Sequence, residues 1–450
     1  MNSMNLKQVN DDYRRIIDSA INPSAREQND RLKDRLMELN FTMHGKPFPT
    51  FLKPLFVDGR QRKYLAYVTN TIMNCVEKVC DLYFSRPDLE PFFEMDPLER
   101  QLADINPRYP RRVINARLDA FLYEKGLKFL EFNCDSPCGM GWHDQLLKLL
   151  AELPVIQQAD DQLGTWREPL LPNLYKMFQR KVRQVGLPED VTYAIVADRE
   201  SSVRYDLELI VDYLHKQGRK ALFADPRDGE YDGNVLRMRG EPVGLVFRDA
   251  IQEFTSHMDE VKPVLDAYRD GKICFINPFS SRVGGLKCVL WFMTDERTAD
   301  LFTDEELKVI GETIPWTRFM REGKTLFEGN EVDLFPFIAK TKDRFVMKPN
   351  AGYGGFGVTI GRSVTQKRWD EVVEAATRES WVVQEAVEIP TEVVPEFTPD
   401  LSWSRKNVNI NFFAYDGEFG GGIVRVSDSE IINVHQGGGL IPICYFGPRG

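Results

Sequence analysis

Apolar residues along the first 110 positions follow a helical period. Stretches 11–21, 25–39 and 64–84 place apolar side chains three and four residues apart, and proline-containing segments separate them. We therefore predict a largely helical N-terminal region over residues 1–110. Residues 113–133 have the pattern of a β-hairpin, and a helix is expected over residues 145–153.

The pattern changes near residue 191. A strand at 191–196, an amphipathic helix at 206–217 and a strand at 220–223 form a β-α-β unit, which is typical of a parallel α/β layer. Residues 243–247 and 273–276 are predicted as further strands of this layer, and the stretch 389–400 as a loop. The chain is thus predicted to be a mixed α/β (α+β) protein. Its expected regions are 1–110, 111–185 with the hairpin, 186–285 with the α/β domain, and a strand-rich 286–450.

Composition narrows the class of protein. The 450 residues allow two or three domains, and 42% hydrophobic with 28% charged residues is ordinary for a soluble protein. A net charge of −10 argues against a general nucleic-acid binder. The start of the chain is polar, no apolar run approaches the length of a membrane span, and the seven cysteines form no C-x-x-C pair. We expect a cytoplasmic protein with no nucleic-acid or membrane partner, and a homodimer is the expectation from the frequency of that state.

The segment from Lys348 to Gly357 is the most informative motif. Apolar runs flank it, so it is predicted as strand, glycine-rich loop and strand. Without side chains, the glycines of this loop let the backbone approach phosphate oxygens, and Lys348 can pair with the same oxygens. These glycines are Gly352, Gly354, Gly355 and Gly357. A P-loop and a dinucleotide fingerprint both lead into a helix, so neither motif fits. The loop predicts an ATP-binding hairpin, and an ordinary glycine-rich turn is the alternative.

The hairpin carries the second motif, Arg-x-Asp followed by Glu-x-Asn. If Gly126 is left-handed in a three-residue turn, Asp119 lies opposite Glu131, Arg117 lies opposite Asn133, and all four side chains share one face. The other face then holds Ala116, Leu118, Ala120, Leu122, Leu130 and Phe132. Two facing carboxylates and an amide form an all-oxygen set suited to Mg²⁺. The alternative is a solvated face with two ion pairs, which a two-residue turn at Lys125-Gly126 would favour.

Three weaker features lie in the second half of the chain. Gln384 and Glu385 end a buried-looking strand, where they are candidates to read an adenine. Arg425 follows a glycine run on a strand and is a candidate phosphate clamp. Lys287 lies just inside a predicted helix. Because no nucleophile or His-x-x-x-His pattern is visible, catalysis by positioning and charge stabilisation is expected.

Together these motifs resemble the ATP-grasp ligases, in the order found in the branch of glutathionylspermidine synthetase and eukaryotic glutathione synthetase. The metal-binding strands precede the glycine-rich loop in that branch, a circular permutation. The resemblance implies a Mg²⁺ site at Asp119, Glu131 and Asn133, with Arg117 beside it. It also implies ATP contacts from Lys287, Lys348, Gln384, Glu385 and Arg425, and an acyl-substrate segment at Asp135 and Ser136.

The resemblance implies an ATP- and Mg²⁺-dependent carboxylate–amine ligase that forms an amide through an acyl phosphate. Arg117 and Arg425 would act in catalysis, and small-molecule acids and amines, such as amino acids, peptides or polyamines, would be the substrates. Two alternatives stay open. One is a phosphotransferase that stops after moving phosphate, and the other is a non-catalytic ATP-binding module.

Overall fold

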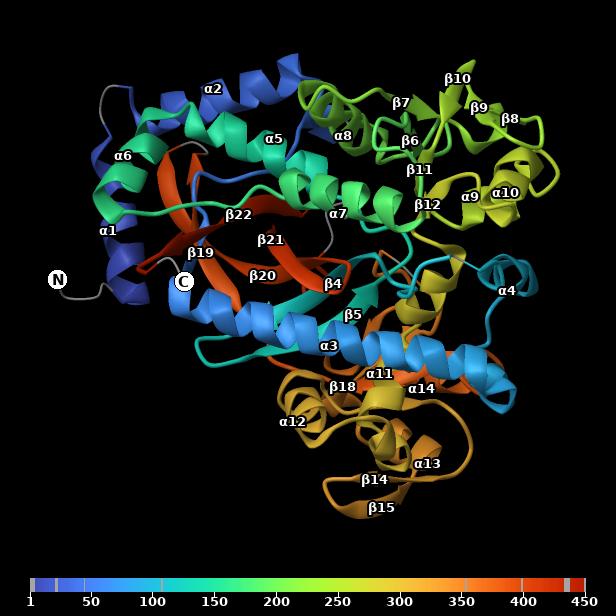
Figure 1. Ribbon diagram of the computed structural model, residues 1–450. Coiled ribbons are helices and arrows are strands. Elements are labelled where there is room, and N and C mark those ends of the chain that lie inside the picture. The colour runs from blue at the N-terminus through green and yellow to red at the C-terminus, as the bar shows by residue number, and fades with distance from the viewer. Residues whose placement is uncertain are drawn as a thin grey trace.

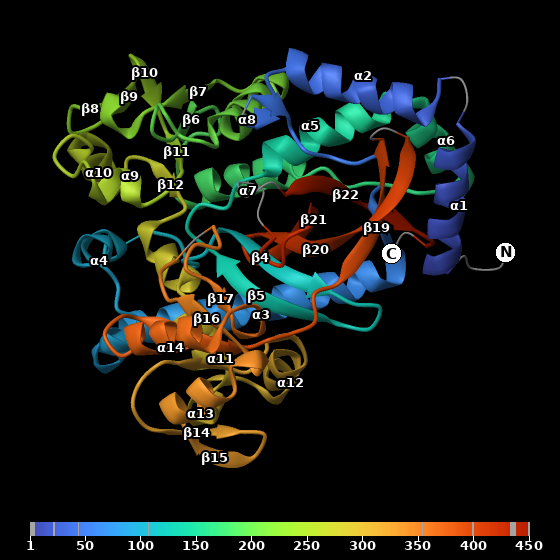
Figure 2. The same cartoon turned by 180° about the vertical axis from the view of Figure 1, so that it is seen from behind.

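The computed structural model describes residues 5–20, 23–43, 45–106, 108–352, 354–397, 400–432 and 438–448. Figures 1 and 2 show three main regions: a sheet with flanking helices at the chain's two ends, a parallel α/β layer, and a smaller strand-and-helix unit below the long helix α3. The predicted mixed α/β class is confirmed. The predicted boundaries between regions stay a prediction.

The N-terminal region is mostly helical, as predicted. Capping side chains define its helix starts: Asn5 accepts from the Gln8 amide, Ser24 and Glu27 form a capping box, and Asp58 accepts from the Arg60 amide. Its elements are α1 (Leu6–Ser19), α2 (Ala25–Glu38), β1 (Thr42–Met43), β2 (Lys46–Pro47), β3 (Leu55–Asp58), α3 (Gly59–Ser85), η1 (Pro87–Phe92) and α4 (Pro97–Ala103).

A seven-stranded sheet joins both ends of the chain. Its order is β3-β22-β21-β20-β4-β5, with β19 also paired to β20, and only β3 and β22 run parallel. The strands are β4 (Asn115–Leu122), β5 (Leu127–Asn133), β19 (Thr391–Phe397), β20 (Leu401–Tyr415), β21 (Glu418–Ser427) and β22 (Gly439–Phe446).

Successive residues along a strand of this sheet point to opposite faces and pack in two different hydrophobic cores. Phe412 and Ala414 pack in the core under α3, whereas Phe413 and Tyr415 pack with the helices on the other face. Those helices are α1, α2, α5 (Met140–Ala151), α6 (Pro154–Leu163) and α7 (Leu171–Gln184). Beyond Phe413 this second face becomes polar at Asn411 and Asn409, and there the cavity of the candidate site begins.

The parallel layer confirms the predicted β-α-β unit. Its strand order is β12-β11-β6-β7, so the chain reverses direction across the sheet between β6 and β11. Its elements are β6 (Tyr193–Val196), α8 (Arg204–Lys216), β7 (Ala221–Ala224), η2 (Pro226–Asp228), β8 (Gly229–Tyr231), β9 (Leu236–Met238), β10 (Glu241–Val243), β11 (Leu245–Arg248), α9 (Gln252–Thr255), α10 (Lys262–Arg269) and β12 (Cys274–Ile276).

The third unit contains the glycine-rich loop on a four-stranded antiparallel sheet, in the order β13-β18-β16-β17. A separate hydrophobic cluster packs beneath it. Its elements, with the segment leading into them, are η3 (Phe279–Gly285), α11 (Cys288–Thr294), η4 (Glu296–Leu301), α12 (Asp304–Thr313), β13 (Thr317–Phe319), β14 (Lys324–Phe327), β15 (Asn330–Asp333), α13 (Leu334–Lys340), η5 (Lys342–Arg344), β16 (Phe345–Pro349), β17 (Thr359–Ile360), η6 (Gly361–Ser363), α14 (Gln366–Ala375) and β18 (Trp381–Glu385).

The predicted loop at 389–400 is wrong over most of its length. Residues 391–397 form β19, although Pro395 lies within it. Among the described strands β19 pairs only with β20, so its other side is an edge, where a proline costs no ladder hydrogen bond. Within the described ranges, no helix is long and apolar enough to cross a membrane. All seven cysteines are free thiols.

Candidate functional site

The β4–β5 hairpin presents the predicted acidic pair in the predicted register. Asp119 lies opposite Glu131, and Arg117 lies opposite Asn133. Gly126 has φ +86°, the left-handed conformation that the prediction required. Near the turn the predicted register is wrong. The predicted three-residue turn would place Tyr123 opposite Leu127, whereas Leu127 lies opposite Leu122.

A β-bulge at Leu130 shifts the pairing register between the turn and the acidic pair. The pairing passes from Ala120–Phe129 directly to Asp119–Glu131, so Leu130 is an extra residue on β5. This corrects the predicted core face: Phe129 is fully buried in the core, while Leu130 lines the cavity. The Leu130 carbonyl accepts a hydrogen bond from Lys348 Nζ at 2.9 Å. The bulge thus restores the register of the acidic pair and helps to hold a lysine.

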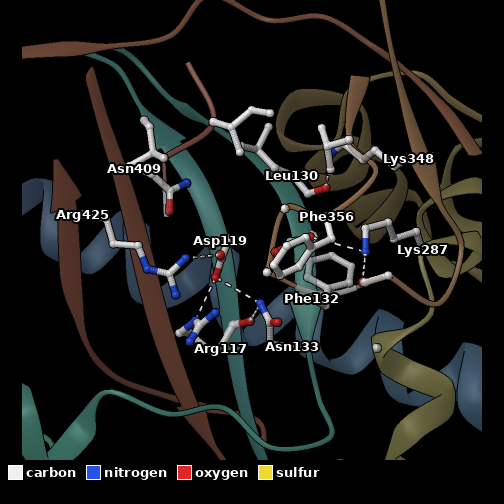
Figure 3. Close-up of a pocket in the computed structure, with 18 of the residues that line it drawn as sticks. Arg117, Asp119, Leu130, Phe132, Asn133, Lys287, Lys348, Phe356, Asn409 and Arg425 are labelled. Carbon is white, nitrogen blue, oxygen red and sulfur yellow. Dashed lines mark hydrogen bonds and ion pairs between the residues drawn. The ribbon is translucent and has the colours of Figure 1, made fainter. Parts of the chain in front are cut away.

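Asp119 is enclosed by cationic and amide groups (Figure 3). Arg117 Nε donates to its Oδ1 at 3.0 Å, Arg425 Nη1 to its Oδ2 at 3.1 Å, and Asn133 Nδ2 to its Oδ1 at 3.2 Å. Asp119 is 4% and Arg117 7% exposed, so this polar face is buried and not solvated. Burial lowers the pKa of Arg117, but Asp119 outweighs it and the pKa is raised. Burial and the neighbouring Arg117 lower the pKa of Arg425.

Two lysines approach from the opposite side of the cavity (Figure 3). Lys287 Nζ lies 3.5 Å from Glu131 Oε2 and donates to the Gly352 carbonyl at 2.5 Å. Lys348 Nζ donates to Gln384 Oε1 at 2.6 Å. Burial raises the pKa of Glu131, but Lys287 and Lys348 outweigh it and the pKa is lowered. Burial, partly offset by Glu131, lowers the pKa of Lys348 to about 8.

The charges at this end of the cavity do not cancel. Arg117, Arg425, Lys287 and Lys348 supply four cations, against the two carboxylates of Asp119 and Glu131. The cavity holds about 680 Å³, a volume ordinary for a small-molecule site. An enclosed excess of positive charge favours an anionic ligand such as a polyphosphate.

The glycine-rich loop forms one wall of the cavity. β16 and β17 pair antiparallel, so the predicted strand–loop–strand motif is confirmed. Gly354, Gly355 and Gly357 have φ values of +64°, +75° and +75°, a backbone region that residues with a side chain rarely adopt. Gly352, Gly354 and Gly355 line the cavity, whereas Gly357 lies at the loop's end against Pro349.

The predicted adenine-reading pair lies at the end of β18 and lines the cavity. Gln384 is 2% exposed; besides accepting from Lys348, its Nε2 donates to Thr317 Oγ1 at 3.0 Å. Its side chain therefore positions Lys348. Glu385 is half-buried and lies 3.3 Å from Arg344. The role of the pair in reading adenine stays a prediction.

Asp135 and Ser136 line the cavity beyond the hairpin. Arg248 Nη2 donates to Asp135 Oδ1 at 2.5 Å, and the Ile251 amide donates to Oδ2 at 3.0 Å. Arg248 is the last residue of β11 and Ile251 lies shortly after it, so the α/β layer holds this segment. Their role as a substrate segment stays a prediction.

Several cavity residues were missed by the sequence reasoning. The cavity is also lined by Asn409 on β20, by Asp249 directly after β11, and by Ser201 between β6 and α8. Ser201 Oγ donates to Asp249 Oδ2 at 3.2 Å. Burial raises the pKa of Asp249 to about 6. Two signals could have found them: the alternation of asparagine with apolar residues over 407–412, and polar residues just after parallel strands, where ligands bind at a reversal of strand order.

No family model matches the sequence, and no curated protein matches it significantly. The fold matches a solved glutathione synthetase-like effector from Globodera pallida in its apo form, with a TM-score of 0.62 and 13% identity, over 93% of this chain and 96% of that chain. A candidate gamma-glutamylcysteine synthetase from Methylobacillus flagellatus matches with a TM-score of 0.42 and 13% identity, over 81% and 85% of the two chains. That second score is too low to support an argument.

The chain therefore has an ATP-grasp fold of the glutathione synthetase-like kind, as the resemblance implies. The circular permutation stays a prediction. The likeness concerns the fold, and the chemistry depends on the cavity described above.

Proposed function

We propose that the protein is an ATP- and Mg²⁺-dependent carboxylate–amine ligase. The observation that carries the proposal is the convergence of Lys287, Lys348, Arg117 and Arg425 with two facing carboxylates around one cavity walled by the glycine-rich loop. The glutathione synthetase-like fold supports the same class of reaction. The substrates would be a small carboxylic acid and an amine, such as an amino acid, peptide or polyamine.

The proposed reaction has two steps. A carboxylate oxygen of the acid attacks the γ-phosphorus of ATP, the bond from that phosphorus to the bridging oxygen breaks, and ADP leaves. The amine nitrogen then attacks the acyl carbon, the carbon–oxygen bond breaks, phosphate leaves and the nitrogen loses a proton. Lys287, Lys348 and the two arginines would neutralise charge on the phosphates. Closure of the glycine-rich loop would exclude water, which otherwise hydrolyses an acyl phosphate.

The residues present fit a magnesium ion. Asp119, Glu131 and Asn133 offer carboxylate and amide oxygens from facing strands, the hard ligands that Mg²⁺ prefers. No group of three or more His, Cys, Asp or Glu able to hold a metal occurs among the residues that the structure describes, so phosphate oxygens and water would complete the set. When bound, the ion would neutralise phosphate charge.

The test is incubation with Mg·ATP and pooled acids, amino acids, peptides and polyamines, followed by nucleotide analysis and mass spectrometry. We expect ADP only when an acid and an amine are both present, and a product lighter than their sum by one water. A phosphorylated product without an amine would instead identify a phosphotransferase. AMP release would contradict the acyl phosphate, and tight ATP binding without turnover in any pool would favour a binding module. The same assay on Lys348→Met shows whether the activity belongs to this cavity.

A further inference from the structure

A buried ion pair links the N-terminal region to the cavity. Glu99 on α4 and Arg282 in η3 are separated by 183 positions, and their Oε2 and Nε atoms lie 2.9 Å apart. Their side chains are 9% and 10% exposed. The second oxygen of Glu99 accepts from Gln252 Nε2 at 3.0 Å. Glu99 therefore holds two residues that line the cavity, Arg282 and Gln252.

Arg282 also reaches the base of the glycine-rich loop. Its Nη2 donates to the Ala351 carbonyl at 3.4 Å, while its Nε remains on Glu99. A guanidinium can make both contacts because its donors form a rigid, planar fork. The pairing with Glu99 matters, since an unpaired charge would be costly at this depth.

The residues on either side of Ala351 are fixed as well. Asn350 is fully buried; its Nδ2 donates to the Phe93 carbonyl at 2.8 Å and its Oδ1 accepts from the Cys288 amide at 2.9 Å. The Gly352 carbonyl accepts from Lys287. Three consecutive residues are thus each held by another segment. The stretch that contains Phe93 and Glu99 holds Asn350 directly and Ala351 indirectly, through Arg282.

The loop beyond this base has a different character. Gly354, Gly355 and Gly357 adopt positive φ, and glycine loses more backbone entropy on ordering than other residues. Phe356 between them is 66% exposed. A fixed base limits the backbone freedom of such a loop and so lowers the entropy that must be lost when it is ordered over a ligand.

We propose that Arg282, held by Glu99, is a positioning residue that fixes the base of the glycine-rich loop for ATP. This inference rests on the proposed ATP binding. It assigns the segment of residues 93–99 a part in the nucleotide site, although that segment contains none of the phosphate-binding lysines. Binding should weaken when the fork is lost, because the loop must then be ordered at the expense of ATP binding energy.

Two measurements on the full chain test the proposal. The first is the rate of chymotrypsin cleavage after Phe356 without nucleotide. The second is the ATP dissociation constant from calorimetry. For Arg282→Gln we expect faster cleavage and about tenfold weaker ATP binding, which corresponds to about 1.4 kcal/mol. Arg282→Lys keeps a positive charge paired with Glu99 but lacks the planar fork. Compared with Arg282→Gln, it should therefore restore thermal stability and only part of the ATP affinity.

Arg167→Gln is the matched control, because it removes another largely buried ion pair. In that pair, near α6, Arg167 Nη1 lies 2.5 Å from Asp160 Oδ2. It should lower thermal stability without changing either readout. If Arg282→Gln fails to fold, Glu99→Gln replaces it, since an amide oxygen can still accept from one of the two partners. Cleavage and ATP affinity within twofold of the control would overturn the proposal. If the wild type binds no ATP, the proposed function fails, and the cleavage rates still decide whether Arg282 fixes the loop.

Discussion

At the residue scale, the buried Lys348 changes its charge close to neutral pH. Burial lowers its pKa to about 8, so its charge is present below that pH and lost as the pH rises through it. Phosphate oxygens stabilise the charged form and should raise the pKa again. We therefore expect ATP binding at pH 8 to take up a proton, and ATP affinity to fall above pH 8.

Calorimetry in buffers of different ionisation enthalpy measures this uptake directly. The variant Lys348→Arg should abolish it, because an arginine does not titrate in this range. Equal apparent enthalpies in all buffers at pH 8 for the wild type would contradict the assignment of Lys348 to the phosphates.

The two carboxylates give a second prediction. Glu131→Gln should reduce ATP consumption by about 100-fold or more, because loss of a metal ligand removes several kcal/mol of transition-state stabilisation. Its side chain is 23% exposed and its ion-pair distance is 3.5 Å, so the fold should survive. ATP consumption measured against Mg²⁺ concentration gives the answer, and unchanged turnover would exclude the metal site.

Asp119→Asn should have a second effect that Glu131→Gln lacks. It leaves Arg117 and Arg425 buried without their shared carboxylate. Breaking a buried pair in this way costs about 3–5 kcal/mol. We expect a clear drop in the free energy of unfolding, measured with urea, for Asp119→Asn alone; equal stability of the two variants would show that the guanidiniums have other partners.

At the scale of the element, the glycine-rich loop allows a matched comparison. Gly357 and Gly329 both have positive φ, +75° and +78°. A Cβ at Gly357 would lie 2.6 Å from Pro349 Cγ, whereas at Gly329, in the β14–β15 turn, it meets nothing within 4 Å. Gly357→Ala should therefore weaken ATP binding, while Gly329→Ala should cost stability only, about 1–2 kcal/mol. Equal ATP affinities, measured by calorimetry, would show that the loop end does not shape the site.

The hairpin shows why register was predictable at one end only. The alternation of Arg117, Asp119, Glu131 and Asn133 fixes which residues share a face, because a one-residue slip would turn the charged side chains from the cavity into the hydrophobic core. The turn geometry gave no comparable signal. The bulge that absorbs the difference falls at Leu130, an apolar residue that directly follows the apolar Phe129. The pattern of residues identified the face. The carbonyl at the bulge accepts a hydrogen bond from Lys348, a residue of a distant segment that no local pattern connects with the hairpin.

At the scale of the whole molecule, the N-terminal helices share a core with later segments. Val9, Tyr13 and Leu36 pack in one cluster with residues of α5 to α8 and of the seven-stranded sheet. Removal of residues 1–58 would also take β3 from β22 and expose that strand as an edge. We expect the truncated protein to be insoluble, as judged by its soluble fraction on expression. A soluble product with a sharp unfolding transition would show that this region is separable.

Helices, strands and the glycine-rich loop were predictable because each follows from a local period or composition. The pairs that complete the site were not. Arg425 and Asp119 are 306 positions apart, and Glu99 and Arg282 are 183 apart. No local pattern connects such residues, since the fold alone brings them together. Nor did the sequence decide whether its large aromatic residues shape a pocket or fill the core. The structure places four of them in the core, Phe41, Phe48, Tyr109 and Trp142, while Tyr353 lies outside the described residues.

The position of β22 between β3 and β21 sets an order for biosynthesis. Thr50 bridges to Leu440 across 390 positions, so the central sheet stays incomplete until those further 390 residues have been translated. At ordinary ribosome speeds this leaves β3 unpaired for roughly 20 to 80 s. During that time the nascent polypeptide carries an open strand and a half-built apolar core. Such a chain would depend on chaperones that hold it at the ribosome, and its yield should be sensitive to their supply.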